Sequence, residues 1–199
     1  RYAAWLGKAR IGEFWGSDIR IPEIASADNP YMARMYETHP KLAEGAGRRS
    51  RNTQKRFARR GVERLIPGFE LTSYVRRGLF PAHYSSKARL MLSEYGPQYP
   101  DPENSRPLVI HSPSHKAKKG TEAVLKIVEE LQKTHDFDFK LIHGVPKLEA
   151  MRITQQCDVF LDQFVIGAHG LTTLEAMAFG TPSICYIKPS LVPMYPPDF

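Results

Sequence analysis

Lysines and glycines follow two apolar runs in the second half of the chain, and together they are suited to holding phosphate. Lys116, Lys118 and Lys119 come after the run LVIHS (108–112). The glycine-rich stretch QFVIGAHGLTT (163–173) comes after a second run and leads directly into a predicted helix. The free N–H groups of a helix N-terminus attract anions, and an exposed charge there is stabilised by about 0.3 to 1 kcal/mol. The pattern predicts a site for a ligand that carries a diphosphate.

An acidic residue in the same helix is suited to binding hydroxyl groups. Glu175 lies five residues after Gly170, about one turn into the helix, among apolar neighbours. A carboxylate there accepts two hydrogen bonds, as the vicinal hydroxyls of a ribose offer them. The glycine of KKGT follows its lysine, the reverse of a P-loop, and the chain has no GxGxxG string. For each feature alone the alternative is a plain turn, a solvated lysine face or a solvated helical glutamate.

The elements that must position these residues follow from the apolar pattern after residue 107. Short apolar runs alternate with segments of helical periodicity, in the order β-α-β-α-β-α-β. The strands are expected at 108–112, 140–144, 158–164 and 182–187. Nearly continuous apolar strands are typical of a parallel sheet that is covered on both faces, and ligands bind outside the carboxyl ends of such strands. The sequence therefore predicts an α/β fold, a Rossmann-like parallel sheet with helices on both faces.

The first half of the chain is less regular, and we expect it to form a separate domain. Strands are predicted over 11–15 and 64–71, on either side of a basic segment. The stretch SEYGPQYPDPENSRP has four prolines and no periodicity, which is typical of a linker. The predicted organisation is a first domain over 1–92, an interdomain linker over 93–107 and a second domain over 108–199, incomplete at its C-terminus.

The charge of the chain is concentrated in one segment. The 199 residues carry 28 Lys and Arg against 21 Asp and Glu, a net charge of +7. Between Lys41 and Arg64 nine basic residues face two acidic ones, so this segment alone accounts for the net charge. No apolar run reaches the roughly 18 to 20 residues of a membrane span. Cys157 and Cys185 both lie in apolar runs, as buried thiols of a reducing compartment do. We expect a cytoplasmic protein.

The arginine-rich segment 48–64 is predicted to be helical and has three interpretations. Its apolar stripe at helical spacing would be Phe57, Ala58, Val62, Leu65 and Ile66. In the first, the segment is a solvated helix face. In the second, it docks peripherally on an anionic inner membrane surface, where each basic residue contributes about 1 kcal/mol to the binding free energy. In the third, it binds nucleic acid. Only one aromatic residue interrupts its arginines, whereas single-strand binders use several, so no nucleic-acid partner is expected.

Three stretches resemble the C-terminal nucleotide-sugar domain of retaining GT-B glycosyltransferases. They are KKGTEAVLKIVEEL (118–131), CDVFLDQF (157–164) and GAHGLTTLEAMAFGTPSICYI (167–187). The likeness covers residues 108–187, and its most specific part is the EAMA string with its flanking glycines. The resemblance implies that the chain is a fragment of a two-domain GT-B enzyme, namely the end of the acceptor-side domain followed by the donor domain.

The resemblance also implies roles for individual residues of the donor site. Lys119 would contact the donor diphosphate, and Glu175 would bind the donor ribose. The backbone N–H groups offered to the phosphates would be those of Gly170, Leu171 and Thr172. The pocket for the base would be lined by Gly144 and Val145. Ser114 stands where the family has an arginine, so His115 or Lys116 would supply that positive charge.

The chain departs from the family at the acidic residue near the reacting sugar, because Gly167 stands at that position. Asp162 or His169 is the candidate replacement. Asp18, in IGEFWGSDIR (11–20), is the candidate from the first domain, and its alternative is a residue that caps a turn. The catalytic candidates are therefore Lys119, Asp162 and Asp18. No metal ligands are assigned, since the Asp-x-Asp string at 136–138 precedes a strand and is interpreted as a turn.

The predicted function is transfer of a sugar from a nucleotide-diphosphate-sugar donor to an acceptor hydroxyl of a glycan or lipid-linked acceptor, as in polysaccharide biosynthesis. The reaction is expected to retain the anomeric configuration and to need no metal or other cofactor, since positive charge stabilises the leaving diphosphate. Two alternatives stay open. One is a degenerate, non-catalytic nucleotide-sugar-binding module, and the other is a basic membrane-surface-binding protein on an α/β scaffold.

Overall fold

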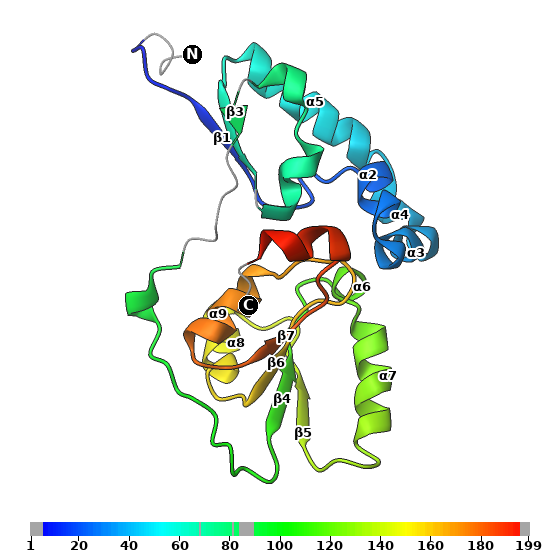
Figure 1. Ribbon diagram of the computed structural model, residues 1–199, viewed down its shortest axis with the longest axis vertical. Helices are drawn as coiled ribbons and strands as arrows, with labels where there is room; N and C mark the ends of the chain where they lie inside the picture. The colour runs from blue at the N-terminus through cyan, green and yellow to red at the C-terminus, as the bar shows by residue number, and fades with distance from the viewer. Residues whose placement is uncertain (1–5, 68, 81, 84–89, 196–199) are drawn as a thin grey trace. The chain divides into compact units, whose positions relative to one another are not determined.

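The computed structural model describes residues 6–67, 69–80, 82–83 and 90–195 and divides the chain into two compact units (Figure 1). The first unit is Arg1–Ala88 and the second is Arg89–Phe199. Within the described residues, no helix is both long enough and apolar enough to cross a membrane.

The first unit contains a parallel three-stranded sheet of order β1-β2-β3. Its strands are β1 (Ile11–Phe14), β2 (Arg64–Pro67) and β3 (Ala82–His83). Four helices connect β1 to β2: α2 (Pro22–Ala27), α3 (Pro30–Thr38), α4 (Pro40–Ala43) and α5 (Ala46–Arg59). Two 3-10 helices follow β2: η1 (Phe69–Tyr74) and η2 (Arg77–Leu79). The strands predicted over 11–15 and 64–71 are thus present, and the second is shorter than expected because η1 takes over its C-terminal half.

Helix α5 contains most of the basic segment, but it ends at Arg59 and not at residue 64. The N–H of Gly61 donates to the carbonyl of Ala58, and the N–H of Val62 donates to that of Phe57. This pair of bonds, with Gly61 at φ 68°, is a Schellman cap, which stops a helix where glycine adopts the left-handed conformation. Leu65 therefore lies buried in β2, and the prediction that it continues a helical stripe was wrong.

Polar contacts that were not predicted from the sequence hold the inward side of α5. The hydroxyl of Ser50 donates to the carbonyl of Ile19 at 2.6 Å. The amide of Gln54 donates to the carbonyl of Tyr74 at 3.0 Å and accepts from the N–H of Arg76 at 2.9 Å. Because both side chains are buried and fully engaged, they fix the rotation of the helix about its axis.

The second unit is built on a parallel four-stranded sheet of order β5-β4-β6-β7. The strands are β4 (Leu108–His111), β5 (Asp138–Leu141), β6 (Val159–Leu161) and β7 (Ser183–Ile184). The helices are α6 (Lys116–Lys119), α7 (Thr121–Leu131), α8 (Lys147–Thr154) and α9 (Leu171–Ala178), with 3-10 turns η3 (Leu92–Glu94) and η4 (Pro189–Met194). Helix α7 lies on one side of the sheet, and α8 and α9 lie on the other (Figure 1). The predicted α/β fold, with a parallel sheet between helices, is confirmed.

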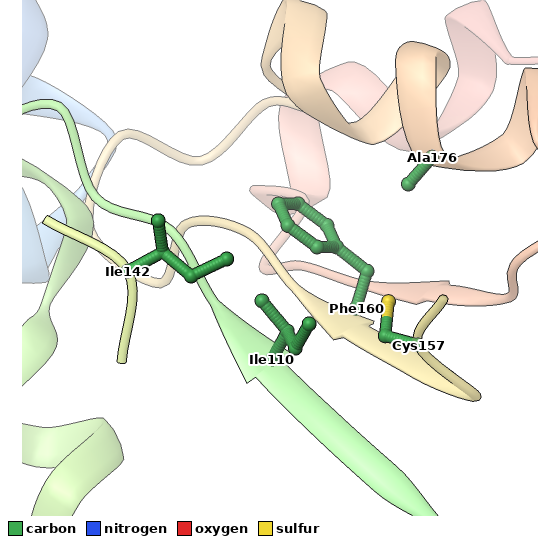
Figure 2. Packing of buried hydrophobic residues seen from close by; sticks show 5 residues of the cluster. All are labelled: Ile110, Ile142, Cys157, Phe160 and Ala176. Atoms are coloured by element: carbon green, nitrogen blue, oxygen red, sulfur yellow. The ribbon is translucent and has the colours of Figure 1, made fainter. Parts of the chain in front are cut away.

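The core of the second unit lies between the sheet and helices α8 and α9. Its buried members are Ile110, Ile142, Cys157, Phe160 and Ala176 (Figure 2). Phe160 projects from β6 toward Ala176 of α9, which fixes that helix above the strand that precedes it. The packing therefore holds the start of α9 close to the carboxyl end of β6.

The proline-rich stretch 93–107 lies against the second unit. The N–H of Gln98 donates to the carbonyl of Phe179 at 2.6 Å. The ring of Tyr95 packs on the ring of Phe179, with centroids 4.9 Å apart. These contacts bring Tyr95 to the end of α9, where it takes part in the site described next.

Candidate functional site at the carboxyl ends of the strands

The strands β4 and β6 end level with each other, so the segments that leave them share one edge of the sheet. The parallel register pairs His111, the last residue of β4, with Leu161, the last residue of β6. The chain runs from β4 into α6, whose last residue is Lys119, and from β6 into Asp162 and the glycine-rich loop. Lys119 and Asp162 are 43 residues apart in the chain and form an ion pair at this edge.

Asp162 is the centre of a hydrogen-bonded cluster, which we call the Asp162 cluster. The carboxylate is 1% exposed. Its Oδ2 accepts from the N–H of Gly170 at 2.7 Å and from the hydroxyl of Thr173 at 2.5 Å. Its Oδ1 accepts from the hydroxyl of Thr172 at 2.9 Å and from the Lys119 ammonium. Each oxygen thus has two donors, so the carboxylate is fully engaged within the protein.

The cluster keeps Asp162 ionised despite its burial. Burial alone would raise the pKa of the carboxyl, but the charge of Lys119 and the hydrogen bonds from Lys119, Thr173 and Gly170 outweigh it and hold the pKa below its ordinary value. Lys119 is itself buried. A buried ion pair is tolerated when both partners and their hydrogen bonds are present, and losing one partner is costly. The two side chains therefore depend on each other.

Gly170 gives the cluster the space it needs. A Cβ at this position would lie 2.6 Å from Oδ2 of Asp162 and 2.9 Å from Nζ of Lys119. Its backbone, at φ −90° and ψ 171°, is one that any residue adopts. Glycine is therefore required here for room and not for conformation. Its N–H, one of the three predicted for the diphosphate, donates to Asp162, and those of Leu171 and Thr172 follow in the first turn of α9.

A buried histidine ties the three elements around the cluster together. His111 is 0% exposed; its Nδ1 lies 2.8 Å from the carbonyl of Leu161, and its Nε2 lies 2.9 Å from the hydroxyl of Thr121 at the start of α7. Burial lowers the pKa of His111. The ring is therefore neutral at pH 7: Nδ1–H donates to the carbonyl, because a carbonyl only accepts, and Nε2 accepts from Thr121.

Glu175 lies one turn further along α9 and is 6% exposed. Its Oε1 is 3.0 Å from Nζ of Lys147, with which the carboxylate forms an ion pair. The hydrogen bond to Glu175, followed by the charge of Glu175, raises the pKa of Lys147, whose side chain is 68% exposed. Burial, followed by the charge of Glu175, raises the pKa of Tyr95. In the part of the chain that the structure describes, the exposed Lys147 is the one counter-ion of this buried carboxylate, and the hydroxyl of Tyr95 lies beside it.

The other predicted donor-site residues lie outside the Asp162 cluster. His115 and Lys116, at the start of α6, are exposed. Gly144 and Val145 follow β5 and are also exposed, and Gly144 adopts φ 75°. This turn is anchored to the segment after β4, because Nδ1 of the neighbouring His143 lies 2.8 Å from the carbonyl of Pro113.

Gly167, which stands at the position of the family's acidic residue, adopts φ 81°. A side chain at such a φ is strained, so the loop as folded here favours glycine over an acid. The carbonyl of Gly167 accepts from the N–H of Lys188 at 2.9 Å. Of the two candidate replacements, Asp162 is directed to Lys119 and α9, and His169 packs edge-on against Tyr195, with ring centroids 5.6 Å apart.

Asp18 lies exposed in the first unit. Its carboxylate accepts from the N–H of Trp15 at 3.2 Å and from the N–H of Gly16 at 2.8 Å. It caps the turn that follows β1, as the alternative interpretation had it.

Thr121, Thr173 and Lys147 also contribute to the site and were not predicted from the sequence. Thr173 is the third residue of α9, past the N-cap position where a hydroxyl is a recognisable signal, and its hydroxyl donates to Asp162. None of the three could be found from local sequence, because their partners come from other strands, loops and helices.

No protein-family model matches this chain, and no curated protein matches it. The function is therefore inferred from the residues and the geometry described above.

Proposed function

We propose that the chain belongs to a retaining GT-B glycosyltransferase, which moves a sugar from a nucleotide-diphosphate-sugar donor to an acceptor hydroxyl of a glycan or lipid-linked acceptor. The single observation that carries the proposal is the convergence of Lys119, Asp162 and the start of α9 at the carboxyl edge of a parallel sheet, with the buried acceptor Glu175 one turn away. This edge is where ligands of such sheets bind.

In this proposal Lys119 and the first turn of α9 stabilise the leaving diphosphate. The bond that breaks joins the anomeric carbon to the diphosphate oxygen, so negative charge grows on that oxygen. The ammonium of Lys119 has three N–H donors, of which Asp162 takes one. The remaining donors, with the N–H groups of Leu171 and Thr172, stabilise the growing charge in a water-poor edge, and no metal ion is needed for this. Asp162 acts by holding Lys119 and α9 in place.

Glu175 binds the ribose of the donor in this proposal. A buried carboxylate whose counter-ion is an exposed lysine favours a ligand that supplies hydrogen-bond donors in place of that lysine. The vicinal hydroxyls of a ribose supply two. Lys147 is mostly exposed, so it moves aside into water at little cost. The exposed residues His115, Lys116, Gly144 and Val145 complete the pocket, the first two toward phosphate and the last two toward the base.

A non-catalytic nucleotide-sugar-binding module is the second candidate, and Gly167 is the observation that favours it. Gly167 adopts a left-handed backbone conformation, in which the acidic residue that the family has at this position would be strained. Such a module binds the donor and does not cleave it. The two candidates therefore differ in donor turnover and agree in donor binding.

Release of nucleoside diphosphate from a set of nucleotide sugars tests the proposal. We expect slow release by the wild-type chain, at least a hundredfold slower release by Lys119→Ala, and no change in Lys126→Ala, an exposed lysine of α7 that serves as the control. Lys119→Arg, which keeps the charge, shows whether a loss reflects charge or folding. Binding without release by the wild type would favour the second candidate. Equal rates in Lys119→Ala and the wild type would remove this lysine from the mechanism.

A further inference from the structure

The outward side of α5, together with its C-cap residue Arg60, carries seven basic side chains and no acidic one, and we call it the α5 basic face. All seven are exposed: Arg48, Arg49, Arg51, Lys55, Arg56, Arg59 and Arg60. Among the described residues, no acidic side chain lies within ion-pair distance of any of them. The first unit holds seventeen Lys and Arg against eight Asp and Glu, whereas the second holds eleven against thirteen. The net positive charge of the chain is thus confined to the first unit, and the basic residues are most concentrated along α5.

The α5 basic face is fixed in place by the opposite side of the helix. Gly47, Ser50 and Gln54 are buried there, and the ring of Phe57 stacks on Phe14 with centroids 5.4 Å apart. At 3.6 residues per turn, the seven basic positions spread over about half of the helix circumference and over roughly 20 Å of its length. The cations therefore form a broad convex surface on a folded element.

We propose that the α5 basic face docks the protein on an anionic lipid surface. Long cationic side chains are flexible, so those at the two margins of this convex surface can extend to the same flat layer of anionic headgroups as those at its centre. The apolar contacts of α5 are used inside the unit, so the helix lies on the headgroups without inserting, unlike an amphipathic anchor that buries an apolar face. The interaction is therefore electrostatic and depends on salt and on the share of anionic lipid.

The shape and composition of this face favour lipid over nucleic acid. Proteins that hold single strands use a groove with aromatic platforms, and Phe57, the only aromatic residue of α5, is stacked inside the unit. Helices that read duplexes present several side chains with both donors and acceptors to base edges. On the α5 basic face Asn52 is the one exposed amide. This proposal does not depend on the glycosyltransferase proposal, because it uses residues of the first unit only.

Vesicle sedimentation of the whole chain tests the proposal. We expect binding to vesicles of phosphatidylcholine with 30% phosphatidylglycerol at 50 mM salt, no binding to pure phosphatidylcholine, and release at 500 mM salt. Each basic residue near such a surface contributes about fivefold to partitioning, so Arg48→Gln, Arg51→Gln, Lys55→Gln and Arg59→Gln together are expected to weaken it by roughly 600-fold. These four side chains are exposed and without acidic partners, so the variant keeps its fold.

Two matched variants separate the α5 basic face from bulk charge. Lys126→Gln, Lys133→Gln, Lys140→Gln and Arg152→Gln remove the same charge from exposed positions of the second unit and are expected to change binding less than about fivefold. Arg48→Lys, Arg51→Lys and Arg59→Lys keep the charge and are expected to keep binding. Equal loss in the two glutamine variants, binding to pure phosphatidylcholine, or no binding by the wild type at 50 mM salt would overturn the proposal. Tighter binding to a 20-base-pair DNA or RNA duplex than to the anionic vesicles at 150 mM salt would overturn it in favour of nucleic acid.

Discussion

Replacing Asp162 by asparagine is expected to destabilise the second unit by about 3 kcal/mol. The change keeps the size of the side chain but removes the charge that compensates the buried ammonium of Lys119, and breaking a buried ion pair by removing one partner costs about 3 to 5 kcal/mol. We take the lower end because the amide oxygen of asparagine still accepts from Gly170 or the threonines. A loss of about 3 kcal/mol corresponds to a roughly hundredfold increase in the open population of the first turn of α9.

Hydrogen exchange followed by mass spectrometry measures this effect locally. Exchange in a peptide that covers the end of β6 and the start of α9 is expected to accelerate by about a hundredfold, and exchange in a peptide of α5 in the first unit serves as the internal control. Adding Lys119→Met to Asp162→Asn removes the buried ammonium that the first substitution leaves without a counter-charge. The double variant is therefore expected to be more stable than Asp162→Asn alone, which reveals coupling between the two residues.

Two results would refute this reasoning about the Asp162 cluster. One is exchange in Asp162→Asn that stays within threefold of the wild type, since a fully engaged buried carboxylate cannot be lost without a cost. The other is strict additivity of Asp162→Asn and Lys119→Met, since residues that form one ion pair do not contribute independently.

Three further predictions concern neighbouring residues. Gly170→Ala is expected to lower the free energy of unfolding by about 1 to 3 kcal/mol, because its Cβ would lie 2.6 Å from Oδ2 of Asp162. Gly96→Ala is the control and is expected to change stability little, because the nearest neighbour of its Cβ would lie 4.0 Å away. Urea unfolding compares the two variants, and equal stability would contradict the close packing at Gly170. Burial lowers the pKa of His111, so below about pH 6.5 the unfolded chain binds a proton that the folded chain does not. The free energy of unfolding is therefore expected to fall as the pH drops from 7.5 to 5.5. His111→Asn is expected to flatten this pH dependence, and an unchanged slope would show that other groups cause it. Cys157 is buried and Cys185 is half-buried, and burial raises the pKa of Cys157 to about 12 and that of Cys185 to about 11. A thiol reagent at pH 8 is therefore expected to react slowly with both until urea unfolds the chain, and rapid reaction of Cys157 in the native chain would contradict its burial.

The elements of the second unit could be predicted because their apolar periodicity is local. The strands predicted at 108–112 and 158–164 appear as Leu108–His111 and Val159–Leu161, and the helix expected to follow the glycine-rich stretch appears as Leu171–Ala178. Each depends on residues that are close in sequence, so the pattern of one segment is sufficient. The parallel order followed from the alternation of strands and helices.

The contacts within the site could not be predicted in the same way. Sequence placed Lys119 and Asp162 at strand ends, but their ion pair joins residues 43 apart and depends on the register of β4 against β6. The salt bridge of Glu175 with Lys147 likewise depends on how α8 and α9 pack on the sheet. The end of α5 was misjudged because Val62 and Leu65 continue a helical spacing, while Gly61 stops the helix through its backbone conformation.

Calorimetric titration of the chain with UDP, GDP, ADP and TDP tests whether the edge of the sheet beside α9 binds a nucleotide. We expect saturable binding of one of these nucleotides, weakened at least tenfold by Glu175→Gln and unchanged by Glu129→Gln, a substitution of an exposed acid of α7. Binding of none of the four by a folded chain, or equal binding by Glu175→Gln and the wild type, would contradict a nucleotide-sugar site at this edge of the sheet.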